Sequence, residues 1–354
     1  MDGTMKREKN VMWNRRRIRQ SSGRVFAAVL AGIMACSMTA CVKYEQPTET
    51  SESVTETTAG EYTLSNAAAS EKTQKIYRYI CENYGTNMLS CQQESTWMGS
   101  PDYEMDYIQE TTGKLPAMRG LDFMNNDFDG VVERSKAWDQ KGGIVTICWH
   151  TGVYGSGYQE SLDEDPDFDR LLTEGTPEYE GMMKSWDQAA KALQQLRDAN
   201  VPVLWRPFHE FDGKWFWWGK GGGEKFIRLW QLMYDKFTNE YQLNNLIWVL
   251  GYSGEVRSGW YPGDSYVDVI GSDTYDNSTN ARAWKRLLKV ADKPMAFHEC
   301  GNVPSVGEFE AAGAMWAWFM IWHTDYIKAN DPENLKAVYQ SEKVITLDEL
   351  PAFN

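Results

Sequence analysis

The chain has 354 residues, of which 42% are hydrophobic and 13% aromatic, so it can bury one large core. Its formal net charge of −14 argues against nucleic acid as a partner, because phosphate groups would be repelled. The six cysteines and four histidines show no zinc-binding spacing such as CxxC or HExxH, so no metal and no other cofactor is expected.

Residues 1–40 have the features of a signal peptide for export. Basic residues from Lys6 to Arg24 precede the apolar run Val25–Ala35, which is short for a transmembrane span. The following Met38-Thr39-Ala40-Cys41 resembles a bacterial lipoprotein signal, in which Cys41 is lipidated and becomes the first residue. An ordinary secretory peptide cut near Ala40 is the alternative. Both interpretations predict export, and the first predicts a lipid anchor at Cys41 that holds the protein at the bacterial cell surface or membrane.

Residues 41–63 are rich in Thr, Ser and Glu and contain almost no large apolar side chains. Such a segment cannot bury enough surface to fold, so it is expected to be a disordered tether. Residues 64–354 contain no second segment of this kind and are interpreted as one domain, expected to act as a monomer.

Eight apolar runs recur through this domain, and they mostly lack strict alternation, which is typical of strands buried on both faces. They are Asn87–Cys91, Leu115–Phe123, Gly143–Trp149, Pro202–Arg206, Asn245–Leu250, Val267–Asp273, Pro294–His298 and Ala314–Trp322. Between many of them lie segments with helical spacing, such as Met182–Leu196 and Phe226–Phe237. Strands that alternate with helices predict an α/β fold, a (β/α)8 TIM barrel. A doubly wound sheet is the alternative, but no GxGxxG follows a strand.

Polar residues follow many of these strands, at the end of a barrel where active sites lie. All four histidines do so, and so do Asp122, Asp273 and Tyr275. The pattern predicts a polar cleft lined by aromatic rings at one mouth of the barrel. Of the histidines, His298 is expected to point away from the barrel axis, because its neighbour Glu299 takes the inward side.

Glu210 lies in the segment Trp205–Gly219, which contains four tryptophans. Aromatic faces stack on the C–H faces of sugar rings, and a partly desolvated carboxyl keeps its proton and can act as an acid. The structural alternative is a buried glutamate paired with Arg206. Glu210 ends the fourth candidate strand and Glu299 the seventh, so both can reach one mouth, as hydrolysis of a glycosidic bond requires. Carboxyl groups about 5–5.5 Å apart would give retention of configuration.

These motifs resemble glycoside hydrolase family 26, the family of retaining endo-β-1,4-mannanases, over roughly residues 89–351. The segments that carry the resemblance are Leu89–Gln93, Pro116–Phe123, Val145–His150, Arg206–Gly219, Asn245–Val249, Asp273–Tyr275, Phe297–Gly301 and Trp318–Trp322. The resemblance implies a β-mannan polysaccharide or oligosaccharide as substrate. It equally admits the family's other substrates, mixed-linkage β-glucan and β-1,3-xylan.

The resemblance also implies a role for each matching residue. Glu210 would be the general acid/base and Glu299 the nucleophile, with Tyr275 donating a hydrogen bond that keeps Glu299 ionised. The remaining expected substrate-binding residues are His209 at the cleaved sugar, Trp322 beneath it, and His150, Trp215 and Asp273 at neighbouring positions. Two positions depart from the family pattern: His323 stands where an arginine is expected, and Cys91 where a glycine is expected.

Other interpretations stay open on sequence alone. The strand-end histidines and Asp273 could hold a metal in a different class of barrel hydrolase, and a non-catalytic, surface glycan-binding lipoprotein is a further possibility. Trp217 and Trp218 fit the core as well as a sugar platform. The acidic segment Asp163–Asp169 has carboxylates at calcium-like spacing, but Phe168 takes the position where an EF-hand needs glycine, so a solvated loop is favoured. Cys81 and Cys91 could pair after export.

Overall fold

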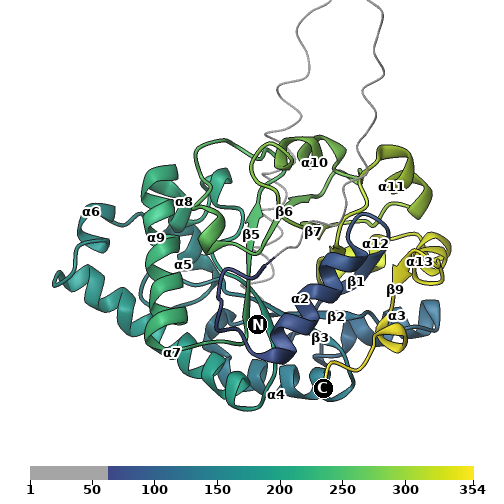
Figure 1. Cartoon of the computed structure of the whole chain (residues 1–354), viewed down its shortest axis with the longest axis horizontal. Coiled ribbons are helices and arrows are strands. Elements are labelled where there is room, and N and C mark those ends of the chain that lie inside the picture. Colours follow the sequence, from purple (N-terminus) through teal and green to yellow (C-terminus); the bar gives the residue numbers. More distant parts are fainter. Residues whose placement is uncertain (1–62) are drawn as a thin grey trace, which may run out of the picture. The chain divides into compact units, whose positions relative to one another are not determined.

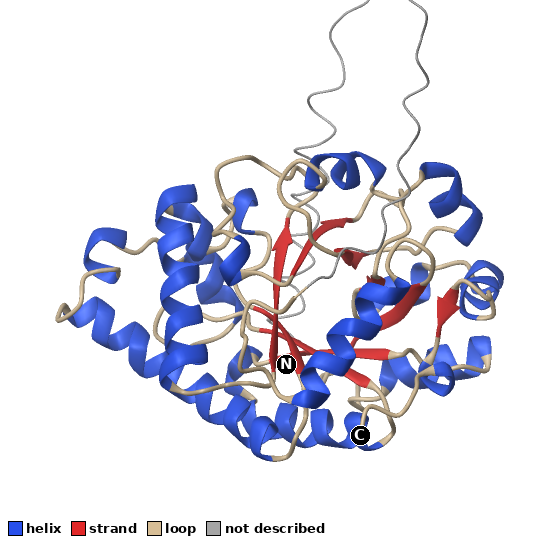
Figure 2. Cartoon of the chain, in the orientation of Figure 1, coloured by secondary structure: helices blue, strands red, loops and turns tan. Residues whose placement is uncertain are grey.

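Eight parallel strands close into a barrel in the computed structural model, which describes residues 63–354 (Figures 1 and 2). The predicted signal peptide, Cys41 and nearly all of the predicted tether lie outside the described residues. The strands are β1 (Met88–Gln93), β2 (Met118–Asp122), β3 (Ile144–Cys148), β4 (Val203–Arg206), β5 (Leu246–Tyr252), β6 (Val269–Thr274), β7 (Met295–Cys300) and β8 (Trp318–Ile321). Because β1 pairs with both β2 and β8, the sheet is closed, which confirms the barrel and excludes the doubly wound alternative.

Helices surround this barrel (Figure 2). They are α2 (Glu71–Asn83), α3 (Tyr103–Thr112), α4 (Phe128–Gln140), α5 (Tyr158–Asp163), α6 (Phe168–Leu171), α7 (Pro177–Asp198), α8 (Trp217–Lys220), α9 (Gly223–Asp235), α10 (Ala281–Leu287), α11 (Val306–Ala312), α12 (Asp325–Ala329) and α13 (Pro332–Tyr339). The predicted helical segments correspond to α7 and α9, and α9 continues into a π-helical turn at Lys236–Glu240.

The longest helix, α7, has local signals at its start and an apolar stripe along its length. Thr176 caps it by accepting a hydrogen bond from the backbone N–H of Tyr179, and Pro177 takes the first turn, where its missing N–H costs nothing. Met182, Trp186 and further residues at helical spacing are buried, so the helix is held mainly by this face.

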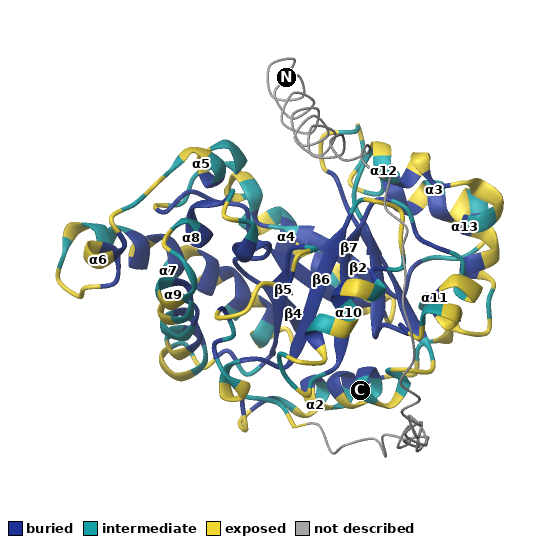
Figure 3. Cartoon of the chain, turned by 90° about the horizontal axis from the view of Figure 1, so that it is seen from above, coloured by how far each residue is buried: buried dark blue, intermediate teal, exposed yellow. Residues whose placement is uncertain are grey.

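The strands are buried on both faces, as Figure 3 shows at the centre of the molecule. One apolar cluster fills the barrel interior with side chains such as Leu89, Leu204 and Val269. Ile76 and Ile80 of α2 belong to this same cluster, together with residues at the start of several strands. Helix α2 therefore covers the amino-terminal end of the barrel, and the carboxyl-terminal mouth is left for the polar residues.

A ninth strand, β9 (Val344–Ile345), adds to β1 outside the ring. Met88 and Leu89 pair in parallel with Val344 and Ile345, and the Ser90 hydroxyl donates to the Ile345 carbonyl at 2.8 Å. A two-residue strand is too short for any periodic pattern, which is why the sequence did not indicate it.

The acidic segment is solvated, as expected. Asp163, Asp165, Asp167 and Asp169 are exposed, and Asp167 caps α6 by accepting hydrogen bonds from two backbone N–H groups. Cys81 and Cys91, whose pairing the sequence left open, are both free thiols in the structure. Among residues 63–354, no helix is long and apolar enough to cross a membrane.

Candidate active site

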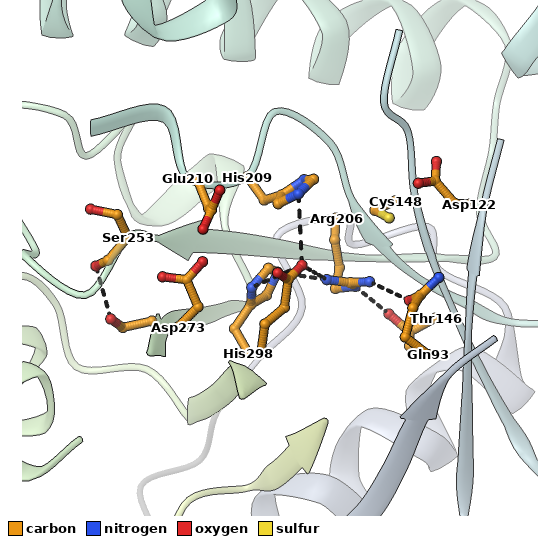
Figure 4. A network of polar contacts seen from close by, with 12 residues as sticks. Gln93, Asp122, Thr146, Cys148, Arg206, His209, Glu210, Ser253, Asp273 and His298 are labelled. Atoms are coloured by element: carbon orange, nitrogen blue, oxygen red, sulfur yellow. Dashed lines mark hydrogen bonds and ion pairs between the residues drawn. The ribbon is translucent and has the colours of Figure 1, made fainter. Parts of the chain in front are cut away.

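The chain turns sharply where β4 ends. Phe208 and Glu210 have positive φ values of 52° and 54°, a conformation that is strained for side chains of this size and that is common at functional sites. Buried contacts hold the turn: the Glu210 N–H donates to the Gly251 carbonyl at 2.8 Å, and the Trp218 indole donates to the His209 carbonyl at 2.8 Å. His209 and Glu210 consequently reach the same polar network above the barrel (Figure 4).

Trp215 folds back toward this turn. Its indole Nε1 donates to Oε2 of Glu210 at 2.6 Å, and a β-carbon at Gly213 would overlap its ring, so only glycine fits there. Trp217 and Trp218 are fully buried, and their indoles donate to backbone carbonyls of Thr151 and His209. These two tryptophans therefore belong to the core, and Trp215 is the one that contacts a candidate catalytic group.

Glu299, on β7, accepts from a tyrosine and an arginine. Tyr275 donates to Oε2 at 2.8 Å, Arg206 donates to Oε1 at 3.2 Å, and His209 Nε2 lies 3.7 Å from Oε1. The guanidinium of Arg206 is fully buried and is fixed by Thr146 and Gln93 as well (Figure 4). Arg206 thus makes an ion pair with Glu299. These contacts favour the anionic form of Glu299.

The prediction that His298 points away from the barrel axis is wrong. Nε2 of His298 accepts from Arg206 Nη1 at 2.9 Å inside the barrel, and its ring occupies space left by Gly251 and Gly271. The cause is an irregular register: β7 slips against β6 at Ser272/Asp273 and against β8 between Phe297 and Cys300. A bulge breaks the alternation of side chains, so two successive residues can face the same side.

Because an arginine cannot accept a hydrogen bond, His298 must accept through Nε2, and its proton must then be on Nδ1. Burial lowers the pKa of His298 well below its usual value, and the charge on Arg206 lowers it further. His298 is therefore a neutral partner of Arg206. Its Nδ1 lies 3.9 Å from Glu299 Oε1 and has no hydrogen-bond partner among the described residues.

Three carboxyl groups interact here: Glu210 and Asp273, both labelled in Figure 4, and Glu299, whose charge acts on Asp273. Burial raises the pKa of Asp273 well above its usual value, and the charges of Glu210 and Glu299 raise it further. Burial also raises the pKa of Glu299 to about 7; Arg206 opposes this rise, Glu210 adds to it, and the Tyr275 hydrogen bond lowers it. Burial and mutual repulsion therefore disfavour the charged forms of Asp273 and Glu299.

His150 and Trp322 form another wall of the site. The Nδ1 atom of His150 lies 2.6 Å from Asp122 Oδ2, and its ring centroid lies 4.6 Å from that of His209 and 6.1 Å from that of Trp322. Burial lowers the pKa of His150, but the carboxyl groups of Asp122, Glu299 and Glu210 together raise it above its usual value. All predicted site residues within 63–354 lie near the carboxyl ends of the strands. The interior residues Gln93 and Thr146, which orient Arg206, were missed because short polar side chains within a strand carry no distinctive pattern.

Two groups of potential metal ligands lie within the described residues, Asp122–Cys148–His150 and Asp273–His298–Glu299. In the first, Asp122 already binds His150 Nδ1, and burial raises the pKa of the Cys148 thiol, which keeps it protonated. In the second, the Arg206 guanidinium contacts both His298 and Glu299 and would repel a cation. The donor chemistry of both groups therefore does not fit a metal site.

A (β/α)8 barrel with one glutamate after β4, another on β7 and aromatic rings at its mouth has the architecture of a glycoside hydrolase. The chain belongs to glycosyl hydrolase family 26, whose family model matches residues 65–349.

Named relatives and solved structures agree with this family. The chain is 35% identical to a mannan endo-1,4-beta-mannosidase of Thermothelomyces thermophilus, over 81% of this chain and 63% of that protein. It is 32% identical to mannan endo-1,4-beta-mannosidase B of Piromyces sp, over 82% of this chain and 54% of that protein. The chain thus spans between half and two-thirds of the length of these relatives.

Among solved structures, the fold matches a ruminal GH26 endo-beta-1,4-mannanase with a TM-score of 0.76 and 31% identity, over 82% of this chain and 71% of that one. It also matches a beta-mannanase from a symbiotic protist of the termite Reticulitermes speratus, complexed with gluco-manno-oligosaccharide. That match has a TM-score of 0.75 and 33% identity, over 82% of this chain and 98% of the other.

Proposed function

We propose that this chain is a retaining glycoside hydrolase that cleaves β-1,4-mannosidic linkages inside mannan, glucomannan or galactomannan. The observation that carries the proposal is the opposed pair of glutamates: Glu299 bound by Tyr275 and Arg206, and Glu210 bound by Trp215. The mannanase names of its relatives support the choice of substrate.

In the first step, Glu299 attacks the anomeric carbon and the bond from that carbon to the glycosidic oxygen breaks. Glu210 gives its proton to the departing oxygen, so the leaving chain departs as a neutral alcohol. In the second step, Glu210, now a carboxylate, takes a proton from water, whose oxygen displaces Glu299 from the anomeric carbon. Two inversions at one carbon give net retention.

The side chains around the pair divide the supporting roles. Arg206 and Tyr275 stabilise the carboxylate of Glu299 that leaves in the second step, and His209 lies beside it for a hydroxyl of the reacting sugar. Trp322 serves as the platform for that sugar, with His150 and Asp273 lining neighbouring positions. Burial and the charges of the two glutamates raise the pKa of Asp273, which favours its neutral form.

The substrate is tested by following products over time on linear mannan, glucomannan, lichenan and β-1,3-xylan. We expect a ladder of manno-oligosaccharides from the first two. Products only from lichenan or xylan would reassign the substrate within the family, and binding without any product would favour a glycan-binding protein.

The mechanism is tested by proton NMR of the first product, which we expect to be the β-anomer. Glu299→Ala should lose several orders of magnitude in rate while still folded, and azide should restore part of it with a product of opposite configuration. Glu210→Ala should slow mannan cleavage strongly but slow much less the first step on aryl mannosides, whose leaving groups need little protonation. An α-anomer from the wild type would remove Glu299 from the nucleophile role.

We also propose that the protein is exported and anchored by a lipid on Cys41, with residues 42–63 as a tether. The support is the order of a basic segment, a short apolar run and Met38-Thr39-Ala40-Cys41. Metabolic labelling with a fatty acid should mark the wild type and not Cys41→Ala. Equal labelling of both proteins, or of neither, would contradict the lipid anchor, and release into the medium would favour an ordinary secretory peptide.

A further inference from the structure

Glu104 is a buried carboxyl group that the proposed mechanism does not use. It lies in the first turn of α3 and is fully buried, and no basic side chain of residues 63–354 forms an ion pair with it. The buried Glu94, by contrast, is bound by Arg119 and Arg134, each at 2.7 Å. Burial of a carboxyl group without a cation costs free energy, and it raises the pKa of Glu104. The groups that Glu104 binds in place of a cation therefore indicate its role.

The Glu104 carboxyl joins two loops that are distant in sequence. Its Oε2 atom accepts from the backbone N–H of Ser95 at 3.0 Å, and its Oε1 atom accepts from the Ser95 hydroxyl at 2.7 Å. The same Oε1 atom accepts from the backbone N–H of Thr324 at 2.7 Å. Ser95 follows β1 and Thr324 follows β8, which are neighbours in the ring, so one side chain connects the loops after two adjacent strands.

The Ser95 end of this connection is fixed to the barrel. Ser95 is buried, and the backbone N–H of the preceding Glu94 donates to the Gly120 carbonyl on β2 at 2.9 Å. With Ser95 fixed, its two hydrogen bonds hold the Glu104 carboxyl in one orientation. The Oε1 atom is thus a preformed acceptor for the N–H of Thr324.

Thr324 has a backbone conformation that threonine rarely adopts. Its φ is 54° and its ψ is −116°, a combination in which the branched β-carbon is crowded by the backbone and which glycine adopts more readily. It directly precedes α12, and its own side chain caps no N–H group of that helix. A strained conformation persists only where the surroundings hold it, and Glu104 binds Thr324 at its backbone N–H.

Thr324 stands between two aromatic residues that reach the active site. Trp322, two residues before it, is the platform for the reacting sugar in the proposed function. Tyr326, two residues after it, has its ring centroid 5.1 Å from that of Tyr275, whose hydroxyl donates to Glu299 at 2.8 Å. A change of φ or ψ at Thr324 would therefore turn the sugar platform relative to the ring that supports Tyr275.

We propose that Glu104 is a positioning residue for the active site. By accepting the N–H of Thr324, its carboxyl holds the strained turn after β8 and so sets the positions of Trp322 and Tyr326. Glu104 acts through Thr324 and not on the substrate itself. This inference rests on the proposed function and adds a residue to it.

The test compares kcat on a soluble manno-oligosaccharide, measured below the melting temperature of each variant. Glu104→Met keeps the length of the side chain but offers only a weak acceptor, so kcat of the folded protein should fall about tenfold or more as the two aromatic residues move. Glu104→Gln keeps an oxygen that can accept from Thr324 and should retain most of kcat. The control Glu110→Gln, at an exposed position on the same helix, should match the wild type.

A second substitution separates positioning from stability. Because glycine adopts positive φ values without strain, Thr324→Gly combined with Glu104→Met should regain much of the kcat that Glu104→Met alone loses. If Glu104 served only to stabilise the fold, removal of the Thr324 side chain would not restore kcat. The proposal is overturned if the double variant regains nothing, or if Glu104→Gln and Glu104→Met lose kcat equally.

If Glu104→Met does not fold, Ser95→Ala takes its place. This variant removes the hydroxyl that binds Oε1 at 2.7 Å, so kcat should fall severalfold and Thr324→Gly should again restore it. A Ser95→Ala protein with the kcat of the wild type would then overturn the positioning role. A wild type that cleaves no manno-oligosaccharide would overturn the proposed function and this inference with it. An active wild type with an unaffected Glu104→Met variant would overturn this inference alone.

Discussion

In the proposed mechanism, the protonation of Glu299 sets the lower limit of the pH range in which the enzyme works. Its pKa is raised to about 7 by burial, and a nucleophile must be ionised to attack, so kcat/KM on mannan should fall as the pH drops below about 7. Tyr275→Phe removes a hydrogen bond that lowers this pKa. Its acidic limb should therefore move to higher pH, which a pH profile of kcat/KM measures. A limb that stays in place would show that Tyr275 does not tune the nucleophile.

His298 acts on Glu299 through Arg206, and it is a positioning residue. Its replacement by leucine removes the acceptor at 2.9 Å from Arg206 Nη1, so the guanidinium loses part of its orientation toward Glu299. We expect His298→Leu to lower kcat by about 10–100-fold with little change in KM, which is typical of a lost supporting contact. Its acidic limb should also move to higher pH.

His298→Gln offers an acceptor and a donor in similar volume, so it should restore most of kcat and the pH profile. Equal losses in both variants, with melting temperatures reduced alike, would mean that His298 serves only to fill the space beside Gly251 and Gly271.

For single residues, the sequence predicted which side chains lie at the mouth of the barrel better than it predicted the directions in which they point. Glu210, Glu299 and His150 could be assigned to the mouth because each follows an apolar strand. The inward direction of His298 depends on a register slip between β6, β7 and β8, which arises from strand pairing across the barrel and has no local pattern. The contacts of the buried Glu104 side chain were equally unpredictable. It accepts hydrogen bonds from the backbone N–H groups of Ser95 and Thr324, which lie in two loops distant in sequence.

Among the helices and strands, the eight strands of the barrel were the elements that the sequence predicted best. Their apolar runs are long and buried on both faces, so eight candidates gave eight strands. The short helices α5, α6, α8 and α12 and the strand β9 were not predictable, because elements of two to six residues are fixed by caps and tertiary contacts.

β9 is expected to contribute to stability and not to catalysis. Ile345 is 8% exposed and joins the interior cluster at the amino-terminal end of the barrel, away from the mouth. Ile345→Ala should lower the free energy of unfolding by about 2–3 kcal/mol. Urea unfolding checks this value, with Glu342→Ala as an exposed neighbour. If kcat of the folded Ile345→Ala protein fell, this would contradict the expectation that β9 serves stability and not catalysis.

For the whole molecule, the active site costs stability. The pKa of Glu299 is raised from 4.5 to about 7 on folding, so the folded state binds more protons between these values and loses stability as the pH rises through 7. Glu299→Gln removes a buried charge and should raise the melting temperature at pH 8 by roughly 2–5 °C, with a smaller effect at pH 5. An equal rise at both pH values would show that the gain is not electrostatic.

The closure of the ring also determines when the chain can fold. Leu89 on β1 pairs with Trp318 on β8, so one edge of the first strand finds its partner only after the other seven strands of the ring have been made. Such distant pairing makes folding slow, because the loop entropy is lost before the contact forms. Until Trp318 has been synthesised, this edge of β1 is an unpaired apolar strand that can pair with another chain. A chain cut short before β8 should therefore aggregate, because this edge of β1 stays unpaired.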